Sequence, residues 1–223
     1  MGDLILGIDD AGRGPVIGPM ILAGCLIDEA TEGEFKKLGI KDSKELTPKR
    51  REFLAAIIRE KAETFEITLA YPNEIDNKLA SGTNLNHLEA IKMAEIINKI
   101  NKGYNRIKVI IDCPSVGISN WKDLLKTKIN NLSNLEVVCE HKADKNHIAV
   151  SAASILAKST REKEMDVLKK IYGEEIGSGY TSDPSTIKFL EKYAQKHEDS
   201  GIFRKSWETW KTAVDKIGQR KLL

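Results

Sequence analysis

Apolar residues occur along the chain in two patterns: short unbroken runs, and longer segments in which they recur every three or four positions. Short runs bounded by glycine, proline or carboxylates are typical of buried strands, and the longer spacing is typical of amphipathic helices. The predicted strands are the short runs Leu4–Asp9, Gly18–Ile27, Arg106–Ile111 and Leu135–His141, together with Thr64–Tyr71, in which apolar and polar residues alternate. The predicted helices are Pro48–Ala62, Asn84–Ile100, Asn120–Ile129, Lys145–Ile171, Ser185–His197 and Ser206–Lys216. The pattern therefore predicts an α/β protein.

The order of these elements predicts a mixed β-sheet flanked by helices. The first two strands are separated only by a short break that contains Gly12–Pro15, and so short a connection favours an antiparallel hairpin. Helices separate the later strands and are expected to pack against the sheet. The glycine-rich segment Gly177–Tyr180 is the predicted boundary between a main domain over residues 1–179 and a small helical C-terminal appendage over residues 180–223.

Composition narrows the class of protein. The 223 residues are 41% hydrophobic, which is enough for a packed core and excludes overall disorder. The net charge is +2, which excludes a histone-like protein that binds polyanions through its global charge. The three cysteines (Cys25, Cys113 and Cys139) have no metal-ligand or disulfide spacing. With no signal peptide and no membrane-spanning run in the sequence, we expect a cytoplasmic protein.

Four aspartates stand where predicted apolar strands end. Asp9 and Asp10 follow one such run, Asp112 follows another, and Asp144 comes after a strand and opens a helix. Each alone is more often a turn residue, a helix cap or a solvated side chain. Carboxylates gathered at one sheet edge would resist ionisation unless cations neutralise them, and Mg²⁺ prefers such oxygen ligands. The combination predicts a metal-dependent phosphoryl-transfer site, in which two ions about 4 Å apart can act on a phosphodiester.

Five ordered sequence blocks carry a resemblance to a known family. They are Gly7–Pro19 (GIDDAGRGPVIGP), Lys41–Leu46 (KDSKEL), Glu140–Asp144 continuing through Val150–Lys158, Gly177–Pro184 (GSGYTSDP) and Arg204–Thr209 (RKSWET). Together they closely resemble the type 2 ribonucleases H, ribonuclease HII in particular, and the last block resembles the archaeal form. The resemblance covers nearly the whole chain. It implies a ribonuclease H-like mixed sheet flanked by helices, with residues 1–179 as the catalytic domain.

The resemblance assigns roles to the four aspartates. It implies that Asp9, Asp10, Asp112 and Asp144 are catalytic and bind Mg²⁺ or Mn²⁺ at a two-ion site, with Asp9 bridging the ions. The implied reaction is two-metal-ion hydrolysis of the phosphodiester 5′ of a ribonucleotide, which leaves a 3′-hydroxyl and a 5′-phosphate. The family usually has glutamate where this chain has Asp10. Aspartate keeps the charge on a shorter arm, so we expect an active enzyme with a shifted preference between Mg²⁺ and Mn²⁺.

The resemblance also implies how substrate is bound. The backbone of Gly12, Arg13 and Gly14 corresponds to the loop that contacts the ribose 2′-hydroxyl, and glycines do let a backbone approach a ligand closely. Tyr180 corresponds to the tyrosine that stacks on the neighbouring deoxyribose. Lys44 corresponds to a lysine that contacts phosphate, with Arg13 and Lys142 as helpers. Ser154 is expected to contact the metal-binding side chains without binding the metal itself.

The implied partners are RNA/DNA hybrids and duplex DNA that contains ribonucleotides. Two rival hypotheses remain open: another nuclease or an integrase on the same fold, and a non-catalytic hybrid-binding protein with a decayed metal site. A mixture of aromatic and basic residues near the C-terminus is consistent with a duplex-gripping appendage and equally with a helix that buries its tryptophans; the residues are Phe203, Arg204, Lys205, Trp207, Trp210 and Lys211. Gln219–Leu223 begins like a sliding-clamp peptide but lacks the closing aromatic pair, so clamp binding stays an alternative. The family resemblance implies a monomer.

Overall fold

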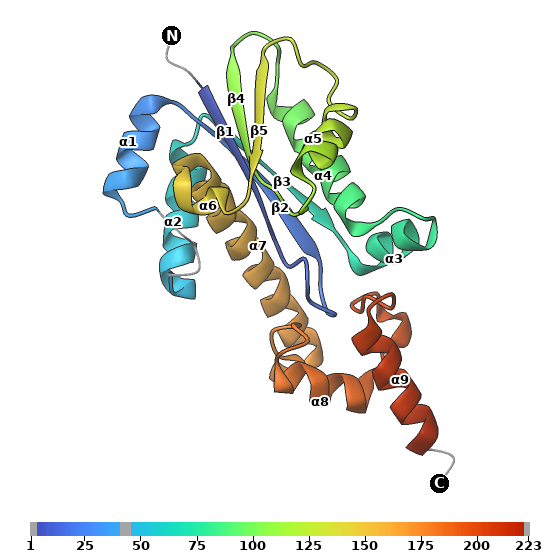
Figure 1. Cartoon of the computed structure of the whole chain (residues 1–223). Helices are drawn as coiled ribbons and strands as arrows, with labels where there is room; N and C mark the ends of the chain where they lie inside the picture. The colour runs from blue at the N-terminus through green and yellow to red at the C-terminus, as the bar shows by residue number, and fades with distance from the viewer. Residues whose placement is uncertain (1–3, 41–45, 221–223) are drawn as a thin grey trace. The chain divides into compact units, whose positions relative to one another are not determined.

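A five-stranded mixed sheet is the centre of the fold in the computed structural model, which describes residues 4–40 and 46–220 (Figure 1). The strands are β1 (Leu4–Ala11), β2 (Met20–Ile27), β3 (Thr64–Ala70), β4 (Ile107–Asp112) and β5 (Leu135–Glu140). Their order is β3-β2-β1-β4-β5. β1 is antiparallel to β2 and parallel to β4, and β4 is parallel to β5. The predicted hairpin and the predicted mixed sheet are therefore confirmed.

The described residues divide into two compact units, each made of several chain segments. The sheet unit contains the N-terminal segment up to Ala11, then Ile21–Thr68 and Leu85–Thr160. The helical unit contains Gly12–Met20, Leu69–Asn84 and the chain from Arg161 onward. The predicted boundary at residues 179 and 180, between a main domain and a helical C-terminal appendage, stays a prediction.

Helices cover both faces of the sheet in the sheet unit (Figure 1). The helices are α1 (Glu29–Lys37), α2 (Pro48–Lys61), α4 (Leu85–Ile100), α5 (Ile118–Lys126), α6 (Ala143–Asn146) and the first part of α7 (Ile148–Tyr172). A Cβ on Gly7 would lie 2.1 Å from the carbonyl carbon of Ala149, so α7 packs on the face to which Gly7 belongs. A Cβ on Gly24 would lie 2.4 Å from Ile96 of α4. Gly24 pairs with Ile8, so these two residues belong to the same face. Ile8 is adjacent to Gly7 in β1 and therefore points to the opposite face from Gly7, which is the face that α4 covers.

The sequence pattern misses two short helices and one break. α1 buries only Phe35 and therefore has no apolar stripe; its start is fixed by the Asp28 carboxylate, which accepts a hydrogen bond from the Thr31 N–H at 2.8 Å. α3 (Pro72–Ala80) begins at a proline and is equally short. The predicted helix Lys145–Ile171 is interrupted at His147, whose extended backbone separates the short helix α6 from α7.

The helical unit has its own core. The helical unit contains α3, the end of α7, α8 (Pro184–Tyr193), α9 (Glu208–Arg220) and the 3₁₀ turns Glu174–Ile176 and Glu198–Ser200. Its buried aromatic side chains are Phe189, Phe203 and Trp210, and the rings of Phe203 and Trp210 lie 4.4 Å apart between centroids. Among the described helices of both units, none is long and apolar enough to cross a membrane.

Candidate metal centre and substrate loop

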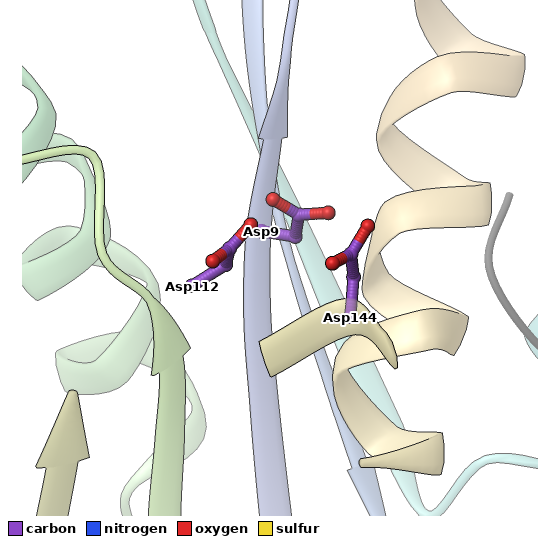
Figure 2. A group of neighbouring side chains, drawn as sticks. All are labelled: Asp9, Asp112 and Asp144. Atoms are coloured by element: carbon purple, nitrogen blue, oxygen red, sulfur yellow. The ribbon is translucent and has the colours of Figure 1, made fainter. Parts of the chain in front are cut away.

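Three aspartates from distant parts of the sequence meet in the sheet unit (Figure 2). Asp9 lies in β1, Asp112 ends β4, and Asp144 lies in α6. One carboxylate oxygen from each lies within 4.8 Å of the others. The cause is the parallel pairing of β1 with β4, in which Ile8 pairs with Ile111. That register brings the next residue of each strand, Asp9 and Asp112, to the same face of the sheet.

A turn after β5 brings Asp144 to this face. Lys142 has a φ of 61°, a left-handed conformation that is uncommon for residues other than glycine and that reverses the chain into α6. The Ala143 N–H then donates to Asp112 Oδ1 at 3.3 Å. The Ser151 hydroxyl of α7 donates to the Asp144 carbonyl oxygen at 2.6 Å. The backbone that carries Asp144 is thus tied both to β4 and to α7.

Burial makes this cluster electrostatically unfavourable without a cation. Asp9 and Asp144 are only 5% and 3% exposed. Burial raises the pKa of Asp9 well above its ordinary value, and the charges of Asp10 and Asp112 raise it further. Hydrogen bonds from the Ser154 hydroxyl and from the Asp10 N–H, the latter at 2.7 Å, act in the opposite direction. Three converging carboxylates with only oxygen donors fit a hard divalent cation such as Mg²⁺ or Mn²⁺.

Asp10 does not belong to this three-residue group. It follows Asp9 in β1 and pairs with Leu22 across the hairpin. Because successive side chains of a strand point to opposite faces, Asp10 belongs to the face that α4 covers. Its charge still acts on Asp9. A role for Asp10 as a metal ligand stays a prediction.

The predicted substrate-binding residues lie mainly in the helical unit. Gly12, Arg13 and Gly14 open a loop that directly follows β1 in the chain. Gly12 has a φ of +80°, and a Cβ there would lie 2.6 Å from the side chain of Arg161, so this position requires glycine. Lys44 lies outside the described residues.

Tyr180 is presented by a rigid turn. Its side chain is 42% exposed. The Asp183 carboxylate accepts hydrogen bonds from the Ser178 N–H and hydroxyl, both at 2.7 Å, which lowers the pKa of Asp183. The buried Thr186 hydroxyl accepts from the Gly179 N–H at 2.9 Å and donates to the Ile176 carbonyl at 3.0 Å. The turn fixes the backbone around Tyr180 and leaves the ring accessible.

Two arginines of this unit are buried, which the spacing of apolar residues does not predict. Arg204 is fully buried and Arg161 is 5% exposed. The Arg204 guanidinium donates to main-chain carbonyls inside the protein, so this side chain does not face a duplex, and a duplex-gripping role for the rest of the appendage stays a prediction. For Arg161, the pattern predicts only that it lies in a helix. The only signal in the sequence is that Arg204 directly follows the apolar pair Ile202–Phe203.

A mixed sheet of this order with helices on both faces and a carboxylate cluster defines the chain as a ribonuclease H-like protein. Residues 6–210 match the family model described as Ribonuclease HII. The chain is 43% identical to ribonuclease HII of Methanocaldococcus jannaschii over 99% of each chain, and 40% identical to ribonuclease HII of Pyrococcus furiosus over 96% and 93%. This chain belongs to the ribonuclease HII family.

Solved structures agree with this assignment. The ribonuclease H2 structure from Pyrococcus horikoshii OT3 has a TM-score of 0.86 and 37% identity, over 96% of this chain and 98% of that one. The ribonuclease HII of Archaeoglobus fulgidus, solved in complex with PCNA, has a TM-score of 0.79 and 36% identity, over 93% and 94%. Bst-RNase HIII, at 20% identity and a TM-score of 0.80, shares the fold. The predicted ribonuclease H-like fold is confirmed.

Proposed function

We propose that this protein is an endoribonuclease that hydrolyses the RNA strand of RNA/DNA hybrids and cuts 5′ of ribonucleotides embedded in duplex DNA. The products are a 3′-hydroxyl and a 5′-phosphate. The observation that carries the proposal is the buried group of Asp9, Asp112 and Asp144 in a chain of the ribonuclease HII family.

The three carboxylates would hold the divalent cations, with Asp9 between Asp112 and Asp144 (Figure 2). Bound cations supply activation of water and neutralisation of the charge that develops on the phosphate. The chain itself contributes preorganisation. Hydrogen bonds from Ser154 and from the Asp10 N–H orient the Asp9 carboxylate, and the Ala143 N–H orients that of Asp112. Ligands fixed in this way need little rearrangement when cations and substrate bind.

Recognition of the ribose is assigned to the loop Gly12–Gly14 and to Tyr180. Backbone N–H groups of the loop would hydrogen-bond the 2′-hydroxyl, the group that distinguishes RNA from DNA. The ring of Tyr180 would stack on the adjacent deoxyribose, which makes cleavage sensitive to the junction. Lys44, with Arg13 and Lys142, would contact phosphates.

Asp10 distinguishes this chain from the usual family pattern. We propose that Asp10 tunes the metal site, as a fourth ligand or through its charge on Asp9, and that the shorter arm shifts the preference between Mg²⁺ and Mn²⁺. Cleavage rates of the wild type and of Asp10→Glu in each metal test this. A changed ratio of the two rates supports the proposal, and an identical ratio in both proteins contradicts it.

The deciding experiment is gel cleavage of a DNA duplex that carries one ribonucleotide, with Mg²⁺, Mn²⁺ or a chelator, beside an all-DNA duplex. We expect one nick 5′ of the ribonucleotide, only with metal, and at least about 10³-fold slower cleavage by Asp144→Asn. The exposed Asp123→Asn is the matched control and should cut normally. Metal-dependent binding without cleavage by the wild type would favour the non-catalytic hypothesis instead.

A sliding clamp is a second proposed partner, because the related Archaeoglobus fulgidus protein was solved in complex with PCNA. The tail Gln219–Leu223 is the candidate segment, and its last three residues lie outside the described part of the chain. Pull-down with a clamp before and after deletion of these five residues tests the proposal; unchanged capture would exclude the tail. The monomeric state and the cytoplasmic location stay predictions.

A further inference from the structure

The main-chain carbonyls of the loop that begins at Gly12 are held from one side by arginine side chains. Arg204 donates through Nη2 to the Gly12 carbonyl at 2.6 Å and through Nη1 to the Arg13 carbonyl at 2.7 Å. Its Nε and Nη2 donate to the Gly18 carbonyl at 3.1 and 3.0 Å. Its own N–H donates to the Val16 carbonyl at 2.8 Å. One fully buried residue thus fixes the orientation of four peptide groups.

Arg161 and Trp207 complete this support. Arg161 donates to the Pro19 carbonyl at 2.6 Å and to the Ile17 carbonyl at 3.2 Å. The Trp207 indole N–H donates to the Gly14 carbonyl at 3.0 Å, and its ring lies 4.9 Å from the Arg204 guanidinium carbon. All of these residues belong to the helical unit.

The direction of the carbonyls determines where the loop amides point. The described peptide bonds include no cis bond, and in a trans peptide the N–H points opposite to the C=O. The peptides that direct the Gly12 and Arg13 carbonyls at Arg204 therefore direct the N–H groups of Arg13 and Gly14 away from it. Gly14 is exposed, and a Cβ on it would meet no atom within 4 Å. Gly14 is therefore accessible to a ligand.

Arg161 links this loop to the turn that presents Tyr180. Its Nη2 donates to the Ser178 carbonyl at 3.3 Å, and its guanidinium carbon lies 5.4 Å from the centroid of the Tyr180 ring. The Gly179 carbonyl accepts from the N–H groups of Val16 and Ile17, at 2.9 and 3.3 Å. The loop assigned to the ribose and the turn assigned to the deoxyribose are thus joined by the Arg161 side chain and by the Gly179 carbonyl.

We infer that Arg204 and Arg161 are positioning residues for ribose recognition, with Arg204 orienting the loop amides and Arg161 fixing that loop against the Tyr180 turn. The inference rests on the proposed function of the loop. Arginine is required because its planar fork donates to several carbonyls at once, whereas a lysine ammonium is a point charge on a flexible stem. A lysine at position 204 would keep the charge and lose the simultaneous contacts.

The test compares Arg204→Lys with a matched variant, Arg59→Lys. Arg59 is partly buried and, like Arg204, donates to a main-chain carbonyl, that of Ala55; it also donates to the Thr160 hydroxyl and lies in the sheet unit. Two quantities are measured for each protein. The first is the ratio of affinities for a duplex with one ribonucleotide and for the all-DNA duplex, in chelator. The second is kcat/KM for cleavage at the single ribonucleotide in Mn²⁺.

Arg204→Lys should bring the affinity ratio to near one and reduce kcat/KM by about 100-fold, with all-DNA affinity retained. Arg59→Lys should leave the ratio unchanged even if it lowers the melting temperature. The inference would be overturned if Arg204→Lys kept the wild-type affinity ratio. It would also be overturned if Arg204→Lys and Arg59→Lys each lost the same affinity for both duplexes. If the wild type binds ribonucleotide duplex preferentially but cuts neither substrate, the proposed catalysis fails while the affinity ratio still decides the positioning role.

A second variant covers the case in which Arg204→Lys does not fold. Trp207→Phe keeps an aromatic ring beside Arg204 and removes the five-membered part of the indole with the N–H that donates to the Gly14 carbonyl. It should lower the affinity ratio by about three- to tenfold. An unchanged ratio in this folded variant would overturn the inference that the carbonyl contacts orient the loop.

Discussion

The substitution Asp9→Asn should stabilise the metal-free protein and abolish its stabilisation by metal. In the wild type, one oxygen from each of Asp9, Asp112 and Asp144 lies within 4.8 Å of the others. Two unit charges at that separation repel by about 1 kcal/mol in water and by about 3.5 kcal/mol at an effective dielectric constant of about 20. Asparagine removes the charge at the most central position and keeps an oxygen that can accept the Asp10 N–H. A net gain of about 1–3 kcal/mol follows.

The pH dependence of this gain follows from the raised pKa of Asp9. The folded state holds the proton more tightly than the unfolded state, so wild-type Asp9 is favourable when protonated and costs stability when ionised. The gain of Asp9→Asn is therefore full above the folded-state pKa and shrinks as the pH falls through it. It disappears below the unfolded value, ordinarily 3.8. At pH 7.5 the variant should be the more stable protein.

Thermal unfolding at pH 7.5 in chelator, and again with Mn²⁺, measures both effects. For a chain of this size, each kcal/mol corresponds to about 2–4 °C. Asp9→Asn should melt higher than the wild type in chelator, and metal should raise the melting temperature of the wild type by several degrees without raising that of Asp9→Asn. The exposed Asp123→Asn should behave as the wild type in both conditions. A lower melting temperature of Asp9→Asn in chelator, or an equal gain from Mn²⁺, would refute the reasoning.

Three further predictions concern packing, thiols and the tyrosine. Gly7→Ala should destabilise the protein by about 3 kcal/mol or more in denaturant unfolding, because its Cβ would lie 2.1 Å from the backbone of Ala149; a loss below about 1 kcal/mol would contradict this. Burial raises the pKa of Cys25 and of Cys139 to about 12, so both should react slowly with a thiol reagent at pH 8 and rapidly only after denaturation. Rapid labelling of Cys25 or Cys139 in the native protein would contradict this prediction. Tyr180→Ala should lose about tenfold in preference for a ribonucleotide followed by deoxyribose, and Tyr180→Phe should keep it; an unchanged alanine variant in competitive cleavage would remove the stacking role.

Strands β1 and β4 and their aspartates can be predicted because each strand is a short, mainly apolar run that leads to a carboxylate. Asp9 and Asp112 are therefore recognisable as candidate ligands from the amino-acid sequence alone. The separation of Asp10 from the cluster is also accessible in principle, since adjacent residues in a strand point to opposite faces. Helix α1 has no such signal, as one buried side chain, Phe35, gives no periodicity.

The burial of Arg204 cannot be predicted from local sequence. A basic residue among aromatics is usually half-exposed, and only tertiary structure shows that backbone carbonyls replace water around its guanidinium. Burying a charge is unfavourable unless hydrogen bonds satisfy it, so the loop and Arg204 depend on one another. The loop carbonyls accept hydrogen bonds from the Arg204 guanidinium, and these same hydrogen bonds hold the loop in one conformation. A loop fixed in this way can hold amides open for a ligand before the ligand arrives, which lowers the cost of ordering the loop on binding.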